Sequence, residues 1–350
     1  MPSSSDNNEQ KFYADAGIHG EFCFKEIIFP GLKYEMQLKR IFTSTKSEFQ
    51  DIDVVDACFG KMLITDGLTQ SAQFDEFVYH ESLVHPALMR FAMASGKTPE
   101  TVMIGGGGEL ATAREVLRHT SVKRVVMVDI DNTVVEVCKK YLPEWGGETV
   151  CNNPRFELII GDAHEWILNT QEVFDVIIMD ISDPVEAGPG IALYTQEFYQ
   201  FAVTKLNPGG VFVTQAGMAS AVPDVNHHKE EHSISANTMS FGPIKNTLAS
   251  VFDVAMGYST SIPSFGSDWG FVMAFNADQK ESAEEEWRMP SIKTIEDLIE
   301  QQIEGGLDSM KHYDGQSHCR MFSLPRPLRL ELEKDDRIMT KANPIFMFNG

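Results

Sequence analysis

Basic side chains are scarce in this chain of 350 residues. It contains 29 lysines and arginines but 51 aspartates and glutamates, which gives a formal net charge of −22 at pH 7. Nucleic-acid binding depends on basic patches that neutralise phosphates, so this balance argues against a nucleic-acid partner. An acidic surface keeps a protein soluble and also attracts cationic ligands, and charge alone favours the first of these two interpretations.

Long apolar runs and paired cysteines are absent as well. No stretch of the sequence approaches the ~18 apolar residues that cross a membrane, and the polar residues 1–10 lack the apolar core of a signal peptide. The five cysteines include no CxxC pair, which argues against a zinc site and against a disulfide framework. We therefore expect a cytoplasmic protein with no membrane partner and no bound metal.

The remaining pattern is that of a globular protein with two domains. Hydrophobic residues make up 43% of the chain, enough for a sizeable core. Residues 1–10 are expected to be disordered, and short alternating runs predict an N-terminal antiparallel β-sheet domain over residues 11–72. A polar insertion loop is expected at 218–242, with its histidines solvated rather than bound to a metal. Residues 291–350 are expected to form a C-terminal extension.

Apolar strands and helical segments alternate from residue 101 onward. Strands are expected at 101–104, 124–128, 156–160, 174–179 and 211–215, and helices at 111–119, 133–141 and 197–206. Such alternation is typical of a mainly parallel, doubly wound sheet. We therefore expect an α/β, Rossmann-like domain over residues 73–290, preceded by the small β domain.

Acidic residues follow four of these strands. Gly105–Gly108 and Glu109 come after the first strand, and the next three strands lead into Asp129, Asp162 and Asp180. Ligands of open α/β sheets bind beyond the carboxyl ends of the strands, so we expect the four acids to share one site. Asp129 is placed to accept both ribose hydroxyls, and Asp162 to accept an adenine amino group. Because Glu109 would repel a diphosphate, an adenosyl sulfonium fits this site better than a dinucleotide.

A second acid follows Asp180 after three residues. Asp183 precedes Pro184, so the two carboxylates are expected to face a ligand together. They suit an amine substrate, because a carboxylate can hold an ammonium ion and then accept the proton that the amine must lose before it attacks. Methyl transfer is the general expectation for an adenosylmethionine-type site, but this pair of acids favours transfer to an amine.

The chain resembles the polyamine aminopropyltransferases, the family of spermidine, spermine and thermospermine synthases, from about residue 20 to the C-terminus outside the insertion. The motifs that carry the resemblance are Asp66–Gln70, Asp75–Glu81, the glycine run with Glu109, Asp129–Asp131, Gly161–Ala163, Asp180–Pro184, Gln215–Gly217, Ile262–Ser264 and Trp269–Met273. The resemblance implies a sheet like that of class I methyltransferases. Within the family the chain looks most like the thermospermine synthases, because His80 replaces a usual glutamine and Glu109 a usual aspartate. Leu110 departs from the family, which usually has glycine after the acid.

The resemblance also implies roles for individual residues. The cosubstrate would be decarboxylated S-adenosylmethionine, and the residues implied to bind it are Gln37, Glu109, Asp129, Asp162 and Ala163. Asp180 is the implied general base. The residues implied to line the channel of the acceptor polyamine are Tyr79, His80, Asp183 and Tyr258.

We therefore expect the protein to transfer an aminopropyl group from decarboxylated S-adenosylmethionine to spermidine, with thermospermine and methylthioadenosine as products. No metal or further cofactor is expected, and the family implies a homodimer or homotetramer. A spermidine or spermine synthase would use the same chemistry on a different amine. A catalytically silent homologue that binds polyamine or nucleoside is the alternative from another class, and a small-molecule methyltransferase is the weakest.

Overall fold

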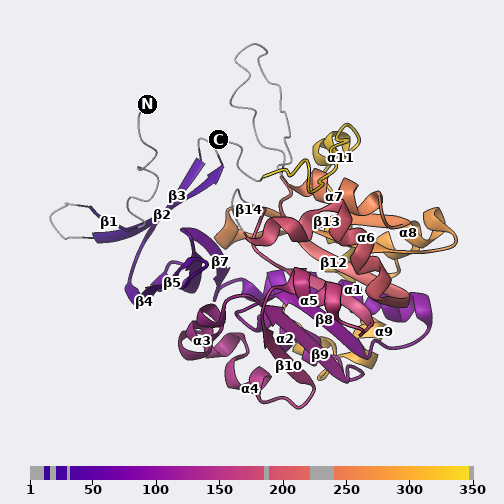
Figure 1. Cartoon of the computed structure of the whole chain (residues 1–350), viewed down its shortest axis with the longest axis horizontal. Helices are drawn as coiled ribbons and strands as arrows, with labels where there is room; N and C mark the ends of the chain where they lie inside the picture. The colour runs from indigo at the N-terminus through magenta and orange to yellow at the C-terminus, as the bar shows by residue number, and fades with distance from the viewer. Residues whose placement is uncertain (1–11, 16–20, 30–31, 185–188, 221–239, 347–350) are drawn as a thin grey trace, which may run out of the picture. The chain divides into compact units, whose positions relative to one another are not determined.

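The computed structural model describes residues 12–15, 21–29, 32–184, 189–220 and 240–346 (Figure 1). The chain divides into two compact units, a smaller one that ends at Glu76 and includes Pro263–Gly266, and a larger one that holds the rest. The segment 1–10, which the sequence predicts to be disordered, lies outside the described residues, as does most of the insertion predicted at 218–242.

The smaller unit is built from two antiparallel sheets. The first contains β1 (Phe12–Asp15), β2 (Glu21–Phe29) and β3 (Leu32–Gln37). The second contains β4 (Arg40–Lys46), β5 (Asp51–Ala57), β6 (Gly60–Thr65) and β7 (Leu68–Ala72). Asp66 and Gly67 connect β6 with β7, and both have the positive φ that a tight hairpin turn requires. The antiparallel β domain predicted from the sequence is thus confirmed.

The larger unit is organised around a seven-stranded mixed sheet. Its strands are β8 (Thr101–Gly106), β9 (Arg124–Asp129), β10 (Phe156–Ile160), β11 (Phe174–Asp180), β12 (Leu206–Met218), β13 (Val254–Ile262) and β14 (Ser267–Phe275). They lie in the order β10-β9-β8-β11-β12-β14-β13, and β14 is antiparallel to both of its neighbours whereas the first five strands are parallel. The predicted Rossmann-like fold is confirmed. The switch point, where successive strands turn from one side of β8 to the other, lies between β8 and β11.

The helices are α1 (Glu76–Ser95), α2 (Ala111–Leu117), α3 (Asn132–Tyr141), α4 (Gly147–Cys151), α5 (Ala163–Asn169), α6 (Gln196–Ala202), α7 (Phe241–Ala249), α8 (Lys280–Arg288), α9 (Ile292–Gln302), α10 (Gly315–Phe322) and α11 (Arg326–Leu332). Side chains from α5, α6, α7 and α11 share one apolar core with the sheet. The helix predicted at 197–206 ends early, because residues 203–205 form a 3-10 turn and β12 begins at Leu206. None of the described helices is both long and apolar enough to cross a membrane.

Candidate active site

The glycine run between β8 and α2 lies directly against the end of β11. The backbone N–H of Gly107 donates a hydrogen bond to the carbonyl oxygen of Asp180 at 2.9 Å. Gly106 has a φ of 79°, and a Cβ atom at this position would clash with the same carbonyl oxygen. Only glycine permits this backbone conformation and this close approach. The run therefore places the acid that follows it, Glu109, beside the switch point of the sheet.

Leu110, where the chain departs from the resembled family, has an unusual backbone conformation. Its φ is 77°, and its side chain is fully buried. A residue with a Cβ atom loses about 1–2 kcal/mol in this left-handed region. The N–H of Leu110 donates to the carbonyl of Gly107 at 2.7 Å, and α2 begins at the next residue. Backbone strain of this kind concentrates at functional loops.

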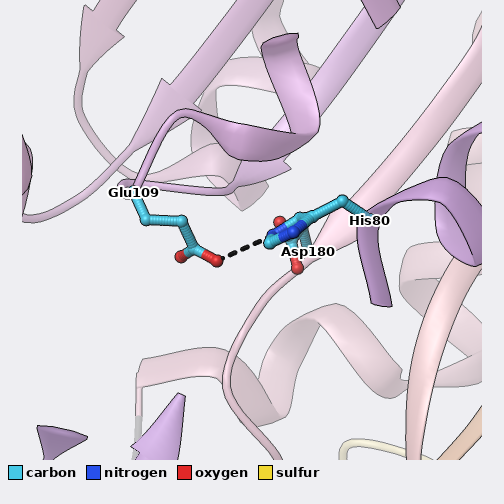
Figure 2. A group of neighbouring side chains, drawn as sticks. All are labelled: His80, Glu109 and Asp180. Atoms are coloured by element: carbon cyan, nitrogen blue, oxygen red, sulfur yellow. Dashed lines mark hydrogen bonds and ion pairs between the residues drawn. The ribbon is translucent and has the colours of Figure 1, made fainter. Parts of the chain in front are cut away.

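Three ionisable side chains from distant parts of the sequence meet at the switch point (Figure 2). His80 comes from α1, Glu109 from the glycine loop and Asp180 from the end of β11. His80 Nε2 and Glu109 Oε1 form a hydrogen bond of 2.9 Å. One ligand atom from each of the three residues lies within 4.8 Å of the others, close enough to surround one small cation. His80 and Asp180 had separate predicted roles, and the structure brings them together.

Both carboxylate oxygens of Asp180 accept a hydrogen bond from a hydroxyl group. Tyr79 Oη donates to Oδ1 at 2.7 Å, and Thr112 Oγ1 donates to Oδ2 at 2.5 Å. Burial raises the pKa of Asp180 and the charge of Glu109 raises it further, whereas His80 and the two hydroxyls lower it. Burial also raises the pKa of Tyr79 far above its ordinary value, so Tyr79 remains a donor. Thr112 has no place among the residues predicted from the sequence.

Asp129 lies on the other side of the glycine loop, at the end of β9. Its Oδ1 accepts the backbone N–H of Asp131 at 2.8 Å, and a Cβ atom at Gly108 would lie 2.9 Å from its Oδ2. Burial raises the pKa of this carboxyl to about 6, and the charges of Glu109 and Asp180 act in the same direction. Asp129 therefore belongs to the same acidic cluster, as the strand pattern predicts.

Asp183 is held at the start of the loop after β11 by a residue of the neighbouring strand. Gln215 of β12 donates through Nε2 to Asp183 Oδ1 at 3.1 Å and to the carbonyl oxygen of Ile181 at 2.8 Å. The backbone N–H of Gly217 in turn donates to Gln215 Oε1 at 2.9 Å. Burial raises the pKa of Asp183 to about 6. Gln215 belongs to a motif of the resemblance, but its supporting role becomes visible only in the structure.

The other predicted site residues have different surroundings. Asp162 caps α5 by accepting the N–H groups of residues 164 and 165, and the Cβ atom of Ala163 lies 3.5 Å from where a Cβ of Gly105 would stand. Tyr258 is fully buried, and its hydroxyl donates to the carbonyl oxygen of Ser82 on α1 at 3.0 Å. Gln37 ends β3 in the smaller unit. The structure thus does not bring the hydroxyl of Tyr258 into the acidic cluster.

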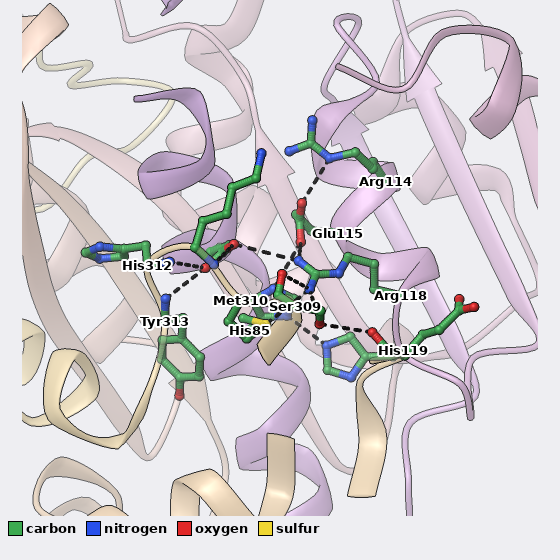
Figure 3. Close-up of polar contacts among 12 residues, drawn as sticks. His85, Arg114, Glu115, Arg118, His119, Ser309, Met310, His312 and Tyr313 are labelled. Carbon is green, nitrogen blue, oxygen red and sulfur yellow. Dashed lines mark hydrogen bonds and ion pairs between the residues drawn. The ribbon is translucent and has the colours of Figure 1, made fainter. Parts of the chain in front are cut away.

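A second polar network, which sequence reasoning missed, holds the helix that carries Tyr79 and His80 (Figure 3). Glu81 accepts the backbone N–H groups of three successive residues, 311 to 313, at 2.8–3.0 Å. His85, one turn further along α1, lies 3.2 Å from Glu115 and 3.0 Å from His119. These contacts tie α1 to α2 and to the segment before α10. The spacing of four residues between Glu81 and His85 indicates that both lie on one face of the helix. No local pattern in the sequence reveals which residues they contact.

Comparisons with known proteins find matches along most of the chain. Residues 76–285 match the spermine/spermidine synthase domain, and residues 22–73 match the spermidine synthase tetramerisation domain. A polyamine aminopropyltransferase of Sulfurisphaera tokodaii is 39% identical over 309 residues, which cover 88% of this chain and 92% of that protein. Thermospermine synthase ACAULIS5 of Arabidopsis thaliana is 37% identical over 326 residues, which cover 93% of this chain and 87% of that protein.

A solved structure supports the same assignment. A crystal structure of spermidine synthase in complex with the transition state analogue AdoDATO superposes with a TM-score of 0.71 at 26% identity, covering 87% of this chain and 92% of that one. The match therefore includes nearly the whole fold and not only the glycine loop. From its sequence, its fold and the acidic cluster at its switch point, this chain belongs to the spermine/spermidine synthase family of polyamine aminopropyltransferases.

Proposed function

We propose that the chain transfers the aminopropyl group of decarboxylated S-adenosylmethionine to spermidine and so forms thermospermine. A nitrogen of spermidine attacks the methylene carbon next to the sulfonium, the C–N bond forms and the C–S bond breaks. The electron pair of that bond stays on sulfur, which leaves as methylthioadenosine. Because a sulfonium is already a good leaving group, the protein must mainly position the substrates and remove one proton. The cluster of His80, Glu109 and Asp180 is the observation that carries this proposal.

Asp180 has the surroundings of the general base. The acceptor nitrogen arrives as an ammonium ion and must lose a proton before its lone pair can attack. A carboxylate can first hold this cation and then accept the proton. Burial and the charge of Glu109 raise the pKa of Asp180, which brings its proton affinity closer to the working pH.

The other acids are assigned to the cosubstrate. Glu109 would hold the aminopropyl ammonium, Asp129 the ribose hydroxyls, and Asp162 with Ala163 the adenine, and the family resemblance assigns Gln37 to the cosubstrate as well. Decarboxylated S-adenosylmethionine carries an ammonium and a sulfonium but no carboxylate, so its charge complements this acidic set. S-Adenosylmethionine itself would bring a carboxylate toward Glu109, which disfavours methyl transfer.

The acceptor is assigned to residues around Asp180. Tyr79 and Asp183 would line its channel, and His80 would shape it together with Glu109, to which it is hydrogen-bonded. Support for spermidine as the acceptor is the pairing of this histidine with a glutamate, the combination by which the sequence resembles thermospermine synthases. The hydroxyl of Tyr258 donates to the backbone of α1, the helix that carries Tyr79. We therefore assign Tyr258 a supporting role for that helix.

The proposed enzyme also has an expected cofactor requirement, cellular compartment and oligomeric state. We expect it to need no metal and no cofactor besides its cosubstrate, and to act in the cytoplasm. The match of residues 22–73 to a tetramerisation domain supports a homo-oligomer, either a dimer or a tetramer.

The test is an incubation of the purified protein with decarboxylated S-adenosylmethionine and, separately, putrescine, spermidine or spermine, with and without EDTA. Methylthioadenosine is quantified and the tetraamine isomers are separated by chromatography. Thermospermine from spermidine, with putrescine inert and EDTA without effect, is expected. Spermidine from putrescine, or spermine from spermidine, would identify one of the other synthases. No methylthioadenosine with any amine would leave a silent binding homologue.

Two variants separate catalysis from folding in this assay. Asp180→Asn should lower the rate by about 10²–10⁴-fold, the usual contribution of a general base, without lowering the thermal midpoint. Asp253→Asn removes an exposed acid paired with Lys280 and serves as the matched control. A near-normal rate for Asp180→Asn would exclude Asp180 as the base.

A further inference from the structure

Thr112 occupies a position where its hydroxyl is not required by the helix. It is the second residue of α2 and is fully buried. Threonine is a poor helix former, and inside helices its hydroxyl often bonds the carbonyl four residues earlier. Here the hydroxyl instead donates to Asp180 Oδ2, across to the end of β11. A buried valine would fill the same volume without the hydroxyl, so the hydroxyl itself calls for an explanation.

The two oxygens of Asp180 face different parts of the site. Oδ2 faces the glycine loop and α2, where Thr112 donates to it and a Cβ atom at Gly107 would lie 3.4 Å away. Oδ1 faces α1, where it accepts from Tyr79. Tyr79 belongs to the residues assigned to the acceptor, and its long side chain can be displaced by an incoming amine. The short side chain of Thr112 stays fixed on α2.

The groups around Asp180 mostly oppose its ionisation. Glu109 of the glycine loop and Asp129 of β9 are acidic, and burial adds to their effect. Asp183 and Tyr194 follow β11, and burial raises the pKa of both. On α1, His80 and Tyr79 act in the opposite direction, as does Thr112 on α2. Within the described parts of the chain, these seven residues bring charge or hydrogen-bonding groups to the surroundings of Asp180 from α1, the glycine loop, α2, β9 and the segment after β11.

We propose that Thr112 is a positioning residue for the base: its hydroxyl fixes one carboxylate oxygen of Asp180, turns the other toward the amine and keeps the carboxylate ionised beside Glu109. This inference rests on the proposed role of Asp180 but not on the identity of the acceptor amine. A base that is protonated before the amine binds can accept no proton, so the hydroxyl matters most at the acidic end of the working range.

The test compares Thr112→Val with Thr112→Ser. Valine keeps the shape and removes the donor, whereas serine keeps the donor and loses a methyl group. The quantities measured are the thermal midpoint and the kcat/KM of the best acceptor amine from pH 5.5 to 9. Loss of a hydrogen bond to a charged group is worth about a 10- to 100-fold change. We therefore expect the kcat/KM of Thr112→Val to fall by about 10- to 100-fold at pH 6.5. The acidic limb of its pH profile, where kcat/KM falls as Asp180 becomes protonated, should shift upward by about one pH unit or more.

The serine variant should remain within about threefold of the wild type and keep its acidic limb, because the donor is retained. An acidic limb in Thr112→Val at the wild-type position would overturn the inference, and so would a serine variant as impaired as the valine one at an unchanged thermal midpoint. If the wild type releases no methylthioadenosine, the proposed function fails first.

If the wild type shows no turnover, the role of Thr112 can still be tested by following the titration of Asp180 directly. The protein is labelled with ¹³C at its aspartate carboxyl carbons, and the signal of Asp180 is assigned by its loss in Asp180→Asn. Its titration midpoint should move upward in Thr112→Val and stay in place in Thr112→Ser. Equal midpoints in all three proteins would contradict the inference independently of catalysis.

Discussion

At the scale of single residues, the hydrogen bond between His80 and Glu109 joins the two residues by which the sequence resembles the thermospermine synthases. His80 is almost fully buried, and its Nε2 lies 2.9 Å from the glutamate. An imidazole in this place is larger than the amide of a glutamine and can carry a positive charge. In the proposed function, both properties would change the space and the charge that the acceptor amine meets.

His80→Gln should therefore shift the acceptor preference. Glutamine can still donate to Glu109 but cannot become charged. The variant should therefore interact differently with a further cationic amine group of the acceptor near this position. We expect the ratio of kcat/KM for spermidine to that for putrescine to fall by about tenfold, which corresponds to about 1.4 kcal/mol of transition-state binding. Parallel rate measurements with both amines check this. An unchanged ratio at a normal thermal midpoint would show that His80 does not select the amine.

Sequence patterns predicted some of these residues and not others for a physical reason. Glu109, Asp129 and Asp180 follow parallel strands, and the ends of parallel strands necessarily meet at one edge. Thr112 could not be predicted, because no local pattern tells across which gap a helical hydroxyl will point. The fully buried position of Tyr258 depends on Phe271 and Phe322, which lie 13 and 64 residues further along the chain and stack on its ring.

At the scale of elements, the C-terminal segment supports the helix that carries the site. Glu81 on α1 binds the backbone of residues 311–313, and the adjoining α10 is anchored through His318. The Nε2 of His318 lies 2.9 Å from the carbonyl oxygen of Trp287, and its Nδ1 lies 2.8 Å from the hydroxyl of Tyr313. The carbonyl can only accept, so Nε2 carries the proton and Nδ1 accepts from Tyr313. This pair of contacts needs a neutral imidazole.

His318 should make the stability of the protein sensitive to mild acid. Burial lowers its pKa to about 4 in the folded state, whereas an unfolded histidine titrates near 6.5. Between these values the unfolded chain takes up a proton that the folded protein does not, so stability falls as the pH falls through this window. From pH 7 to 4.5 the loss from this residue is about 2–3 kcal/mol.

Urea unfolding of the wild type and His318→Gln at pH 7 and 4.5 measures this effect. Glutamine retains a donor for the carbonyl of Trp287 but does not titrate. The variant should be less stable at pH 7, yet the difference between its two unfolding free energies should be smaller by about 2–3 kcal/mol. Equal pH dependence of the two proteins would mean that His318 is not the responsible group.

At the scale of the whole molecule, the strand pattern predicted the five parallel strands, because each is a short apolar run between turn or helix signals. It did not predict the antiparallel pair β13 and β14, in which β14 pairs with β12 on one side and with β13 on the other. The register between β13 and β14 runs without a shift from Val254 opposite Phe275 to Ile262 opposite Ser267. Long-range pairing of this kind has no local signal.

The proposed association into dimers or tetramers should depend on the smaller unit. In the isolated chain this unit exposes large apolar side chains, which are Phe22, Ile27, Leu32, Ile41, Phe49 and Phe74. Burying one such side chain stabilises an interface by about 1.5–3 kcal/mol, and an aspartate there adds a desolvation penalty. We expect Ile27→Asp to weaken association by about 100-fold or more, measured as mass by light scattering over a dilution series.

Met289→Asp is the matched control, since it introduces the same charge at an equally exposed apolar residue of the larger unit. It should leave the mass unchanged. A constant mass in Ile27→Asp would show that the interface lies elsewhere. An equal loss of mass in Met289→Asp would show that the effect of the added charge is not specific to the smaller unit.

The acidic cluster has a further consequence for the molecule when no substrate is bound. Asp129, Asp180 and Asp183 all have raised pKa values in the folded state, so near neutral pH their ionisation favours the unfolded chain. A cationic ligand relieves this repulsion and binds only the native form, and the native population rises with ligand concentration. We therefore expect the cationic substrates of the proposed reaction to protect the enzyme as well: where amines are scarce, a larger share of the molecules should be unfolded and open to proteolysis.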